Sequence, residues 1–232
     1  MPAPHPRHRC AGFTILEMSV VLVVIALIIG GVSVGRDVYR SAVAERISTQ
    51  FIQGWILAYD RYVAQVGGVP ADNLSNPTGK VNQGGSPLCR DDLRDEMLRY
   101  GIALPEGRAE GLESRYVYQD AANVPQELEV CFMTAPEWAE PAAGNNYKNH
   151  PRNVMRLTGL TPELAHQLDV RLDGQINSRF GRVREVGSHN LTTAVSLPPP
   201  DQPWSSDDTA RLNGNTSDHQ VRTLNAYLKM NR

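Results

Sequence analysis

Residues 10–35 form an almost unbroken apolar stretch that contains one charged side chain, Glu17. From Met18 onward the stretch is long enough to cross the hydrocarbon core of a bilayer as an α-helix. An unpaired carboxylate in hydrocarbon costs roughly 3 kcal/mol or more, so its presence there points to a function or a partner. Because Arg7 and Arg9 precede the stretch, the short N-terminal segment is expected to stay on the cytoplasmic side.

The order of these features resembles the N-terminus of the type IV prepilin family, which includes the pseudopilins. The resemblance is carried by GFTILEMSVVLVVIALIIGG, in which Gly12 precedes an aromatic residue and Glu17 follows five residues after Gly12. It implies that a dedicated peptidase cuts between Gly12 and Phe13 and methylates the new amine of Phe13. Residues 1–12 would then be a leader that is removed, and Glu17 would act with Phe13 in assembly.

Other kinds of N-terminal segment fit this pattern less well. A secretory signal has a shorter apolar core followed by a small-residue cleavage site, and no such site follows here. A lipoprotein signal has its cysteine after the apolar core, whereas Cys10 precedes it. An uncleaved membrane anchor stays open as an alternative, although it leaves Glu17 without a purpose.

The overall charge gives no general attraction to nucleic acid or to anionic lipid. The chain of 232 residues is long enough for one domain beside an anchor. The whole chain has 23 basic and 25 acidic residues. Because Arg7 and Arg9 are lost with the leader, the remaining chain has 23 − 2 = 21 basic residues and a net charge of 21 − 25 = −4. A nucleic-acid partner is therefore not expected.

Two cysteines remain after the leader, Cys89 and Cys131. They form an even pair in a part of the chain that is expected to face an oxidising compartment, which favours a disulfide. Closing a loop of about forty residues would contribute about 3–4 kcal/mol to stability. Two buried free thiols are the alternative.

A second pattern predicts that the helix continues beyond the apolar stretch. Apolar residues recur every three to four positions, as on one face of an amphipathic helix, at Ile47, Phe51, Trp55, Tyr59 and Tyr62–Val63. A pair of glycines and a proline at residues 67–70 give a stop signal. We therefore expect one helix over residues 13–66, about 80 Å long. Its membrane half would cover residues 13–35 and its amphipathic half residues 36–66.

Residues 67–232 are expected to form a periplasmic or extracellular head. Short helices are predicted at residues 90–100 and 161–172, the second capped by Thr161. Strands are predicted at residues 114–119, 128–133 and 182–186, with a final amphipathic piece at 221–230. The expected fold class is α+β, in which a long N-terminal helix carries a small antiparallel sheet. Trp138 and Trp204 stand in proline-bounded segments that are interpreted as loops, where they either contact another subunit or cover the sheet.

No pattern points to catalysis. Metal-ligand spacings, a phosphate loop and a nucleophile elbow are all missing from the sequence, so no enzyme activity, cofactor or metal is expected. An oxygen-rich stretch at Asp207, Asp208 and residues 213–218 admits calcium but lacks a recognised loop spacing, which favours a solvated loop. The histidines that follow the leader stand singly in polar surroundings and are expected at the surface: His150, His166, His189 and His219.

Three arginines gather around one aromatic residue near the end of the predicted head. Arg179, Arg182 and Arg184 surround Phe180, so the arginines could contact phosphates while the ring stacks on a base. The favoured interpretation is a strand with solvated arginines, because the acidic residues Asp173 and Glu185 flank it.

The resemblance to prepilins implies a structural subunit of a type IV pilus or a related filament, assembled through its N-terminal helix. The alternative is a minor pilin or pseudopilin at a filament tip, in type II secretion or in binding DNA or another partner. The implied partners are other pilin subunits, the prepilin peptidase and an inner-membrane assembly platform. The implied location is a single-pass inner-membrane protein with a periplasmic head, which then enters a filament.

Overall fold

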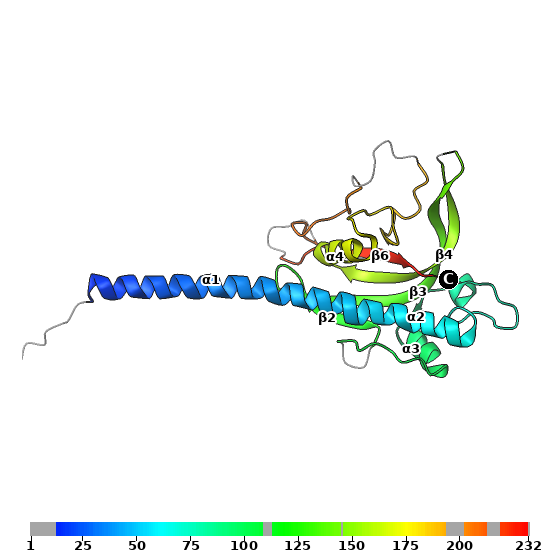
Figure 1. Cartoon of the computed structure of the whole chain (residues 1–232), viewed down its shortest axis with the longest axis horizontal. Helices are drawn as coiled ribbons and strands as arrows, with labels where there is room; N and C mark the ends of the chain where they lie inside the picture. Colours follow the sequence, from blue (N-terminus) through cyan, green and yellow to red (C-terminus); the bar gives the residue numbers. More distant parts are fainter. Residues whose placement is uncertain (1–12, 109–112, 145, 194–201, 213–218, 232) are drawn as a thin grey trace, which may run out of the picture. The chain divides into compact units, whose positions relative to one another are not determined.

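The computed structural model describes residues 13–108, 113–144, 146–193, 202–212 and 219–231 (Figure 1). The chain divides into two units, Met1–Ala42 and Val43–Arg232. Helix α1 (Ile15–Arg46) is followed without interruption by a π-helical segment (Ile47–Ile52) and by α2 (Gln53–Val66). The long helix predicted from the sequence is confirmed, with its first residue at Ile15 instead of Phe13.

In the first unit, α1 has apolar side chains that are exposed along its length. Among the residues that the structure describes, this is the one helix long and apolar enough to cross a membrane. An apolar surface of this size is unfavourable in water, so the segment needs lipid or other helices around it.

In the second unit, the long helix buries the face that its periodicity predicts. Phe51, Trp55 and Tyr59 are fully buried. The ring of Phe132 lies 6.0 Å from that of Trp55 and 5.0 Å from that of Tyr59. The helix ends at Gly67, whose φ of 82° is left-handed and whose N–H donates to the Val63 carbonyl.

The head contains an antiparallel sheet, so the predicted α+β class is confirmed (Figure 1). The strand order is β1-β3-β4-β6-β5, and β2 also pairs with β3. Helices α3 (Arg90–Arg99) and α4 (Pro162–Asp173) lie where the sequence predicts them, and Thr161 caps α4. The strands are β1 (Leu88–Cys89), β2 (Arg115–Gln119), β3 (Pro125–Ala142), β4 (Asn146–Leu160), β5 (Val183–Glu185) and β6 (Leu224–Lys229).

Strands β3 and β4 form a hairpin much longer than the strand predicted at residues 128–133. Pro136 lies at a shift of register between Ala135 and Trp138. A proline is tolerated there because the ladder is already interrupted and its missing N–H removes no bond from it. Trp138 therefore lies within a strand, and its assignment to a loop is wrong.

The two faces of the sheet are covered differently. On one face, side chains of α2 and α4 join those of the strands in the main core. Successive strand residues point to opposite faces, so Tyr227 and Val154 lie on the other side from Leu228 and Met155. That second face carries a small cluster around Trp138.

The disulfide predicted between Cys89 and Cys131 is present. The two residues are directly paired in the β1–β3 ladder, with their Cα atoms 4.5 Å apart. The bond therefore ties the loop that follows the long helix to a central strand of the sheet.

Candidate functional site

Glu17 lies in the first turn of α1, where its carboxylate is bound by Thr14. Glu17 Oε2 accepts hydrogen bonds from the backbone N of Thr14 at 2.8 Å and from its Oγ1 at 2.9 Å. In return, the Glu17 N–H donates to Thr14 Oγ1 at 3.2 Å. This is a capping box, which satisfies two N–H groups at the start of the helix.

The role of Thr14 was missed from the sequence, although the spacing T-x-x-E at the start of an apolar run is its known signal. Phe13 is 79 % exposed beside this cap, and Gly12 lies outside the described residues. The carboxylate of an isolated chain is thus satisfied locally, next to the residue that would become the new N-terminus.

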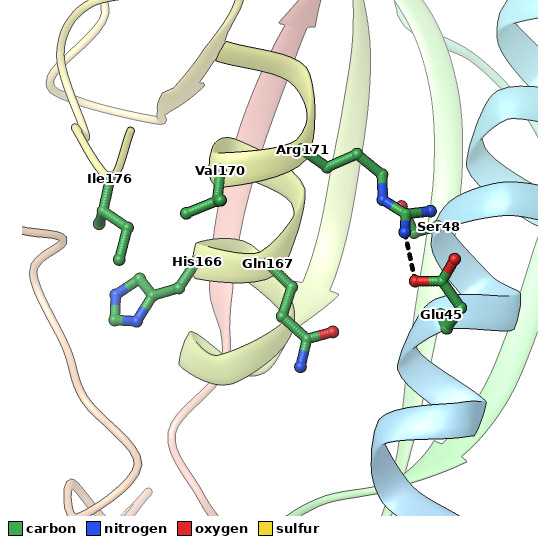
Figure 2. Close-up of a pocket in the computed structure, with 7 residues that line it drawn as sticks. All are labelled: Glu45, Ser48, His166, Gln167, Val170, Arg171 and Ile176. Atoms are coloured by element: carbon green, nitrogen blue, oxygen red, sulfur yellow. Dashed lines mark hydrogen bonds and ion pairs between the residues drawn. The ribbon is translucent and has the colours of Figure 1, made fainter. Parts of the chain in front are cut away.

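A groove lies within the second unit, beside the π-helical segment (Figure 2). It has a volume of about 480 Å³. Glu45 and Ser48 come from the long helix, Ile176 from the segment after α4, and α4 itself contributes His166, Gln167, Val170 and Arg171. The residues that line the groove are far apart in the sequence, and no sequence motif predicted the groove.

The three arginines near Phe180 do not form an exposed basic patch. Arg179 and Arg184 are only 5 % and 6 % exposed, so the expectation of solvated arginines is wrong for both. Arg179 Nη2 donates to the Leu191 carbonyl at 2.7 Å and also to that of Thr193. These two guanidinium groups are occupied by the protein's own backbone.

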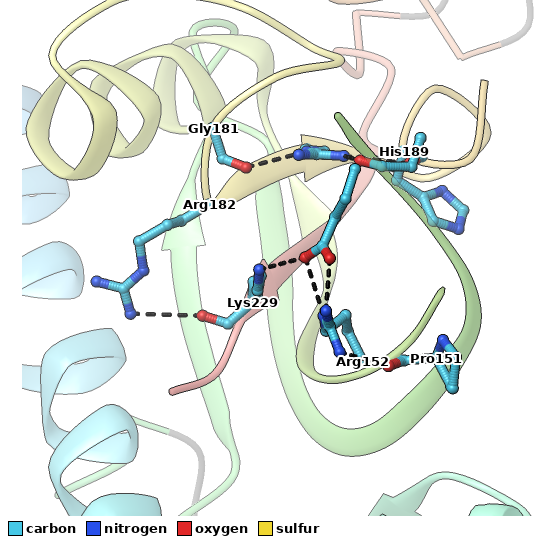
Figure 3. A network of polar contacts seen from close by, with 9 residues as sticks. Pro151, Arg152, Gly181, Arg182, His189 and Lys229 are labelled. Carbon is cyan, nitrogen blue, oxygen red and sulfur yellow. Dashed lines mark hydrogen bonds and ion pairs between the residues drawn. The ribbon is translucent and has the colours of Figure 1, made fainter. Parts of the chain in front are cut away.

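Arg184 covers the small cluster on the second face of the sheet. Its guanidinium lies 4.1 Å from the ring centroid of Trp138, and its Nη1 donates to the Ala139 carbonyl at 2.7 Å. Its Nε donates to Gly181 O, within the network that Figure 3 shows. Burial lowers the pKa of Arg184 to about 10. Arg182 is half-buried and donates to the Lys229 carbonyl.

A neighbouring carboxylate organises the rest of this network. Arg152 and Lys229 both donate to Glu140 (Figure 3). The hydrogen bond from Arg152, followed by that from Lys229, lowers the pKa of Glu140 to about 2. The cluster ties β3, β4 and β6 together and is saturated by its own ion pairs.

His189 is buried, so its expected surface position is wrong. Its ring packs edge-on against Tyr227, with centroids 4.7 Å apart. Burial, and then the charge of Arg184, lowers the pKa of His189.

Trp138 and Trp204 are also buried. Of the two roles expected for them, covering the sheet and contacting another subunit, their burial favours covering the sheet.

Asp169 is a fully buried carboxyl group on α4. Its Oδ2 accepts from the Asn177 N–H at 2.6 Å and from Trp204 Nε1 at 3.0 Å. Its Oδ1 has no hydrogen-bond partner among the described residues. Burial raises the pKa of Asp169 to about 7, the two donors oppose this rise, and the nearby charge of Asp173 adds to it.

The oxygen-rich stretch falls partly outside the described residues, which omit 213–218. Asp207 accepts from Thr209, and Asp208 Oδ1 accepts from the Glu163 N–H at the start of α4. Within the described ranges, no three His, Cys, Asp or Glu side chains are grouped as metal ligands.

Comparison with known proteins gives one match. Residues 7–33 match the family model described as the prokaryotic N-terminal methylation motif. The chain therefore carries a prepilin-type methylation motif, in the segment that contains Gly12, Phe13 and Glu17. No match to the chain was found among curated proteins or among solved structures.

Proposed function

We propose that this protein is a subunit of a type IV pilus or of a related filament, such as the pseudopilus of type II secretion. The observation that carries the proposal is the methylation motif at residues 7–33, within which Glu17 is the one charged residue of a membrane-length apolar stretch. The α+β head that follows the long helix is consistent with this role.

In this proposal, cleavage of the Gly12–Phe13 bond releases the amine of Phe13, and methylation leaves that amine cationic. Residues 1–12 are lost, residues 13–35 span the membrane and later line the filament core, and residues 67–232 form the head. Glu17 pairs with the Phe13 amine of a neighbouring subunit. Each of these charges is penalised in hydrocarbon when alone, so both are satisfied only when the subunits are in register.

Processing is tested by intact mass and N-terminal sequencing of the protein from native membranes and from sheared filaments. A chain that begins with N-methylated Phe13 supports the proposal. Its abundance in the sheared fraction separates a main subunit from a scarce one. A chain that still begins at Met1, in cells with an active prepilin peptidase, contradicts the proposal and leaves an uncleaved anchor.

The pairing role of Glu17 is tested by substituting it. Glu17→Ala, Glu17→Val and Glu17→Gln should all be processed, because the cleaved bond is untouched. Incorporation into filaments should fall about a hundredfold or more in each, since removing one partner of a buried ion pair costs about 3–5 kcal/mol.

Glu17→Gln is the informative variant, because its amide oxygen can still accept from Thr14 and preserve the helix cap. If only the cap matters, Glu17→Gln will assemble normally while Glu17→Ala will not. Normal incorporation of Glu17→Gln would therefore refute the pairing of charges.

A further inference from the structure

The groove of Figure 2 contains a buried hydroxyl group without a partner. Ser48 is 3 % exposed, and its Oγ makes no hydrogen bond to any described residue. A buried polar atom that is left unpaired destabilises the folded chain. Ser48 also belongs to the π-helical segment, a local irregularity that is frequent at functional sites. Both observations make the groove a candidate binding site.

The walls of the groove combine opposite charges with exposed apolar groups. Arg171 is ion-paired with Glu45, and both side chains remain partly accessible to solvent. Val170 and Ile176 are 48 % and 40 % exposed, although both are aliphatic. An occupant that complements this surface carries a cation, an anion and an apolar or aromatic group close together.

One face of α1 carries this combination. Arg36, Asp37 and Tyr39 are all exposed, and Tyr39 is 55 % exposed. At about 100° per residue, the three side chains lie within one half of the helix surface. They supply a cation for Glu45, an anion for Arg171 and an aromatic ring that also bears a hydroxyl group.

We propose that the groove lined by Glu45, Ser48, Val170, Arg171 and Ile176 binds the Arg36–Asp37–Tyr39 face of helix α1 from a second copy of this chain. The Tyr39 ring fills the apolar part between Val170 and Ile176, and an aromatic side chain buries about 150–250 Å² in such a site. Arg36 lies against Glu45, and Asp37 against Arg171. A polar atom of the incoming helix supplies the partner that Ser48 lacks.

This inference rests on the proposed function, because filament assembly is what brings two copies together. It adds a specific contact outside the hydrocarbon, between the start of the soluble half of one helix and the head of another chain. Since exposed ion pairs contribute little to binding, the charges mainly set the register, and the buried Tyr39 ring provides most of the affinity.

Disulfide cross-linking in cells tests the contact directly. The full-length double variant Tyr39→Cys/Val170→Cys should give disulfide-linked dimers and longer ladders in the membrane and sheared-filament fractions. The native Cys89 and Cys131 are already joined to each other. We expect about tenfold or more dimer than in control pairs, because docking holds the two thiols at millimolar effective concentration.

Two control pairs match the test pair in exposure. Val38→Cys/Val170→Cys moves the first thiol about 100° around α1, outside the Arg36–Asp37–Tyr39 face, to a position where Val38 is also exposed. Tyr39→Cys/Leu98→Cys moves the second thiol to an exposed position on α3. A further variant, Asp37→Lys added to the test pair, should reduce its cross-linking because it places a cation against Arg171.

The outcomes separate this inference from the proposed function. If the chain is processed and assembles, but the test pair cross-links no better than the controls, the docking site is refuted and the filament role stands. That result is also expected if a lipid surface or an unrelated protein fills the groove. If the chain is neither processed nor assembled, both proposals fail.

Discussion

Asp169 should make the stability of the head depend on pH, and Asp169→Asn should remove that dependence. The carboxyl group is fully buried, and ionisation would leave Oδ1 as an unpaired charge. Its pKa is raised from 3.8 to about 7 by burial. At about 1.4 kcal/mol for each pH unit between these values, the effect on stability is about 4 kcal/mol.

The sign follows from proton binding. The folded chain holds the Asp169 proton more tightly than the unfolded chain, so this group favours folding most below pH about 4. Its contribution falls as pH rises, and the loss is complete above pH about 7. In Asp169→Asn the side-chain oxygen still accepts from Asn177 and Trp204, but nothing titrates. At pH about 8 the variant should therefore be more stable than the native chain by up to about 4 kcal/mol.

The assay is urea unfolding of the full chain in detergent between pH 4 and pH 8, followed by the fluorescence of the tryptophans, of which Trp204 contacts Asp169. Asp207→Asn is the control, because hydrogen bonds from Thr209 lower the pKa of that exposed carboxyl group. Asp207→Asn should change the slope of stability against pH in the direction opposite to the change that Asp169→Asn causes. Parallel stability curves for the native chain and Asp169→Asn would refute the reasoning.

Three further substitutions test the packing of the head by thermal or urea unfolding. Gly159→Ala should destabilise by about 2–5 kcal/mol, because φ is +87° and an added Cβ would lie 2.0 Å from the Glu127 carbonyl oxygen. Gly174→Ala, with φ +82° and no atom within 4 Å of the added Cβ, should cost only about 1–2 kcal/mol, and equal losses would contradict the steric argument. Arg184→Met should cost about 2–4 kcal/mol, because it leaves backbone carbonyls unpaired, and a neutral effect would show that Arg184 is dispensable.

The parts of the fold that follow from local signals were predictable. The periodicity of Phe51, Trp55 and Tyr59 identified the buried face of the long helix, and Thr161 before Pro162 identified the start of α4. These signals depend on residues within one or two turns of each other, and tertiary packing then agrees with them.

The long hairpin was not predictable from the same kind of signal. Prolines at 136, 141 and 151 made the segment read as a loop, yet β3 and β4 run through them. What keeps these residues in strands is pairing across the hairpin and the cover that Arg184 gives to Trp138. The contact between Arg184 and Trp138 joins residues 46 positions apart, so no local pattern contains it.

The same distinction divides the candidate sites. Glu17 was identified from the sequence because a single charge in an apolar stretch is a local anomaly. The groove was not, because Glu45 and Ser48 meet Val170 and Arg171 only after the head has folded. The arginines near Phe180 were misjudged because their charge suggested solvent, whereas backbone carbonyl groups of the folded head bind Arg179 and Arg184.

The capping box at Thr14 changes the free energy of the proposed assembly step, because Glu17 has to leave the cap in order to pair with another subunit. Before assembly, Glu17 is not an unsatisfied carboxylate, because Thr14 donates to it twice. A cap of this kind contributes about 0.5–2 kcal/mol. In the proposed filament, pairing with the amine of a neighbouring Phe13 has to offset the loss of these contacts before it stabilises the assembly. A misplaced subunit finds no such amine and keeps its own cap, so the exchange favours subunits that are in register.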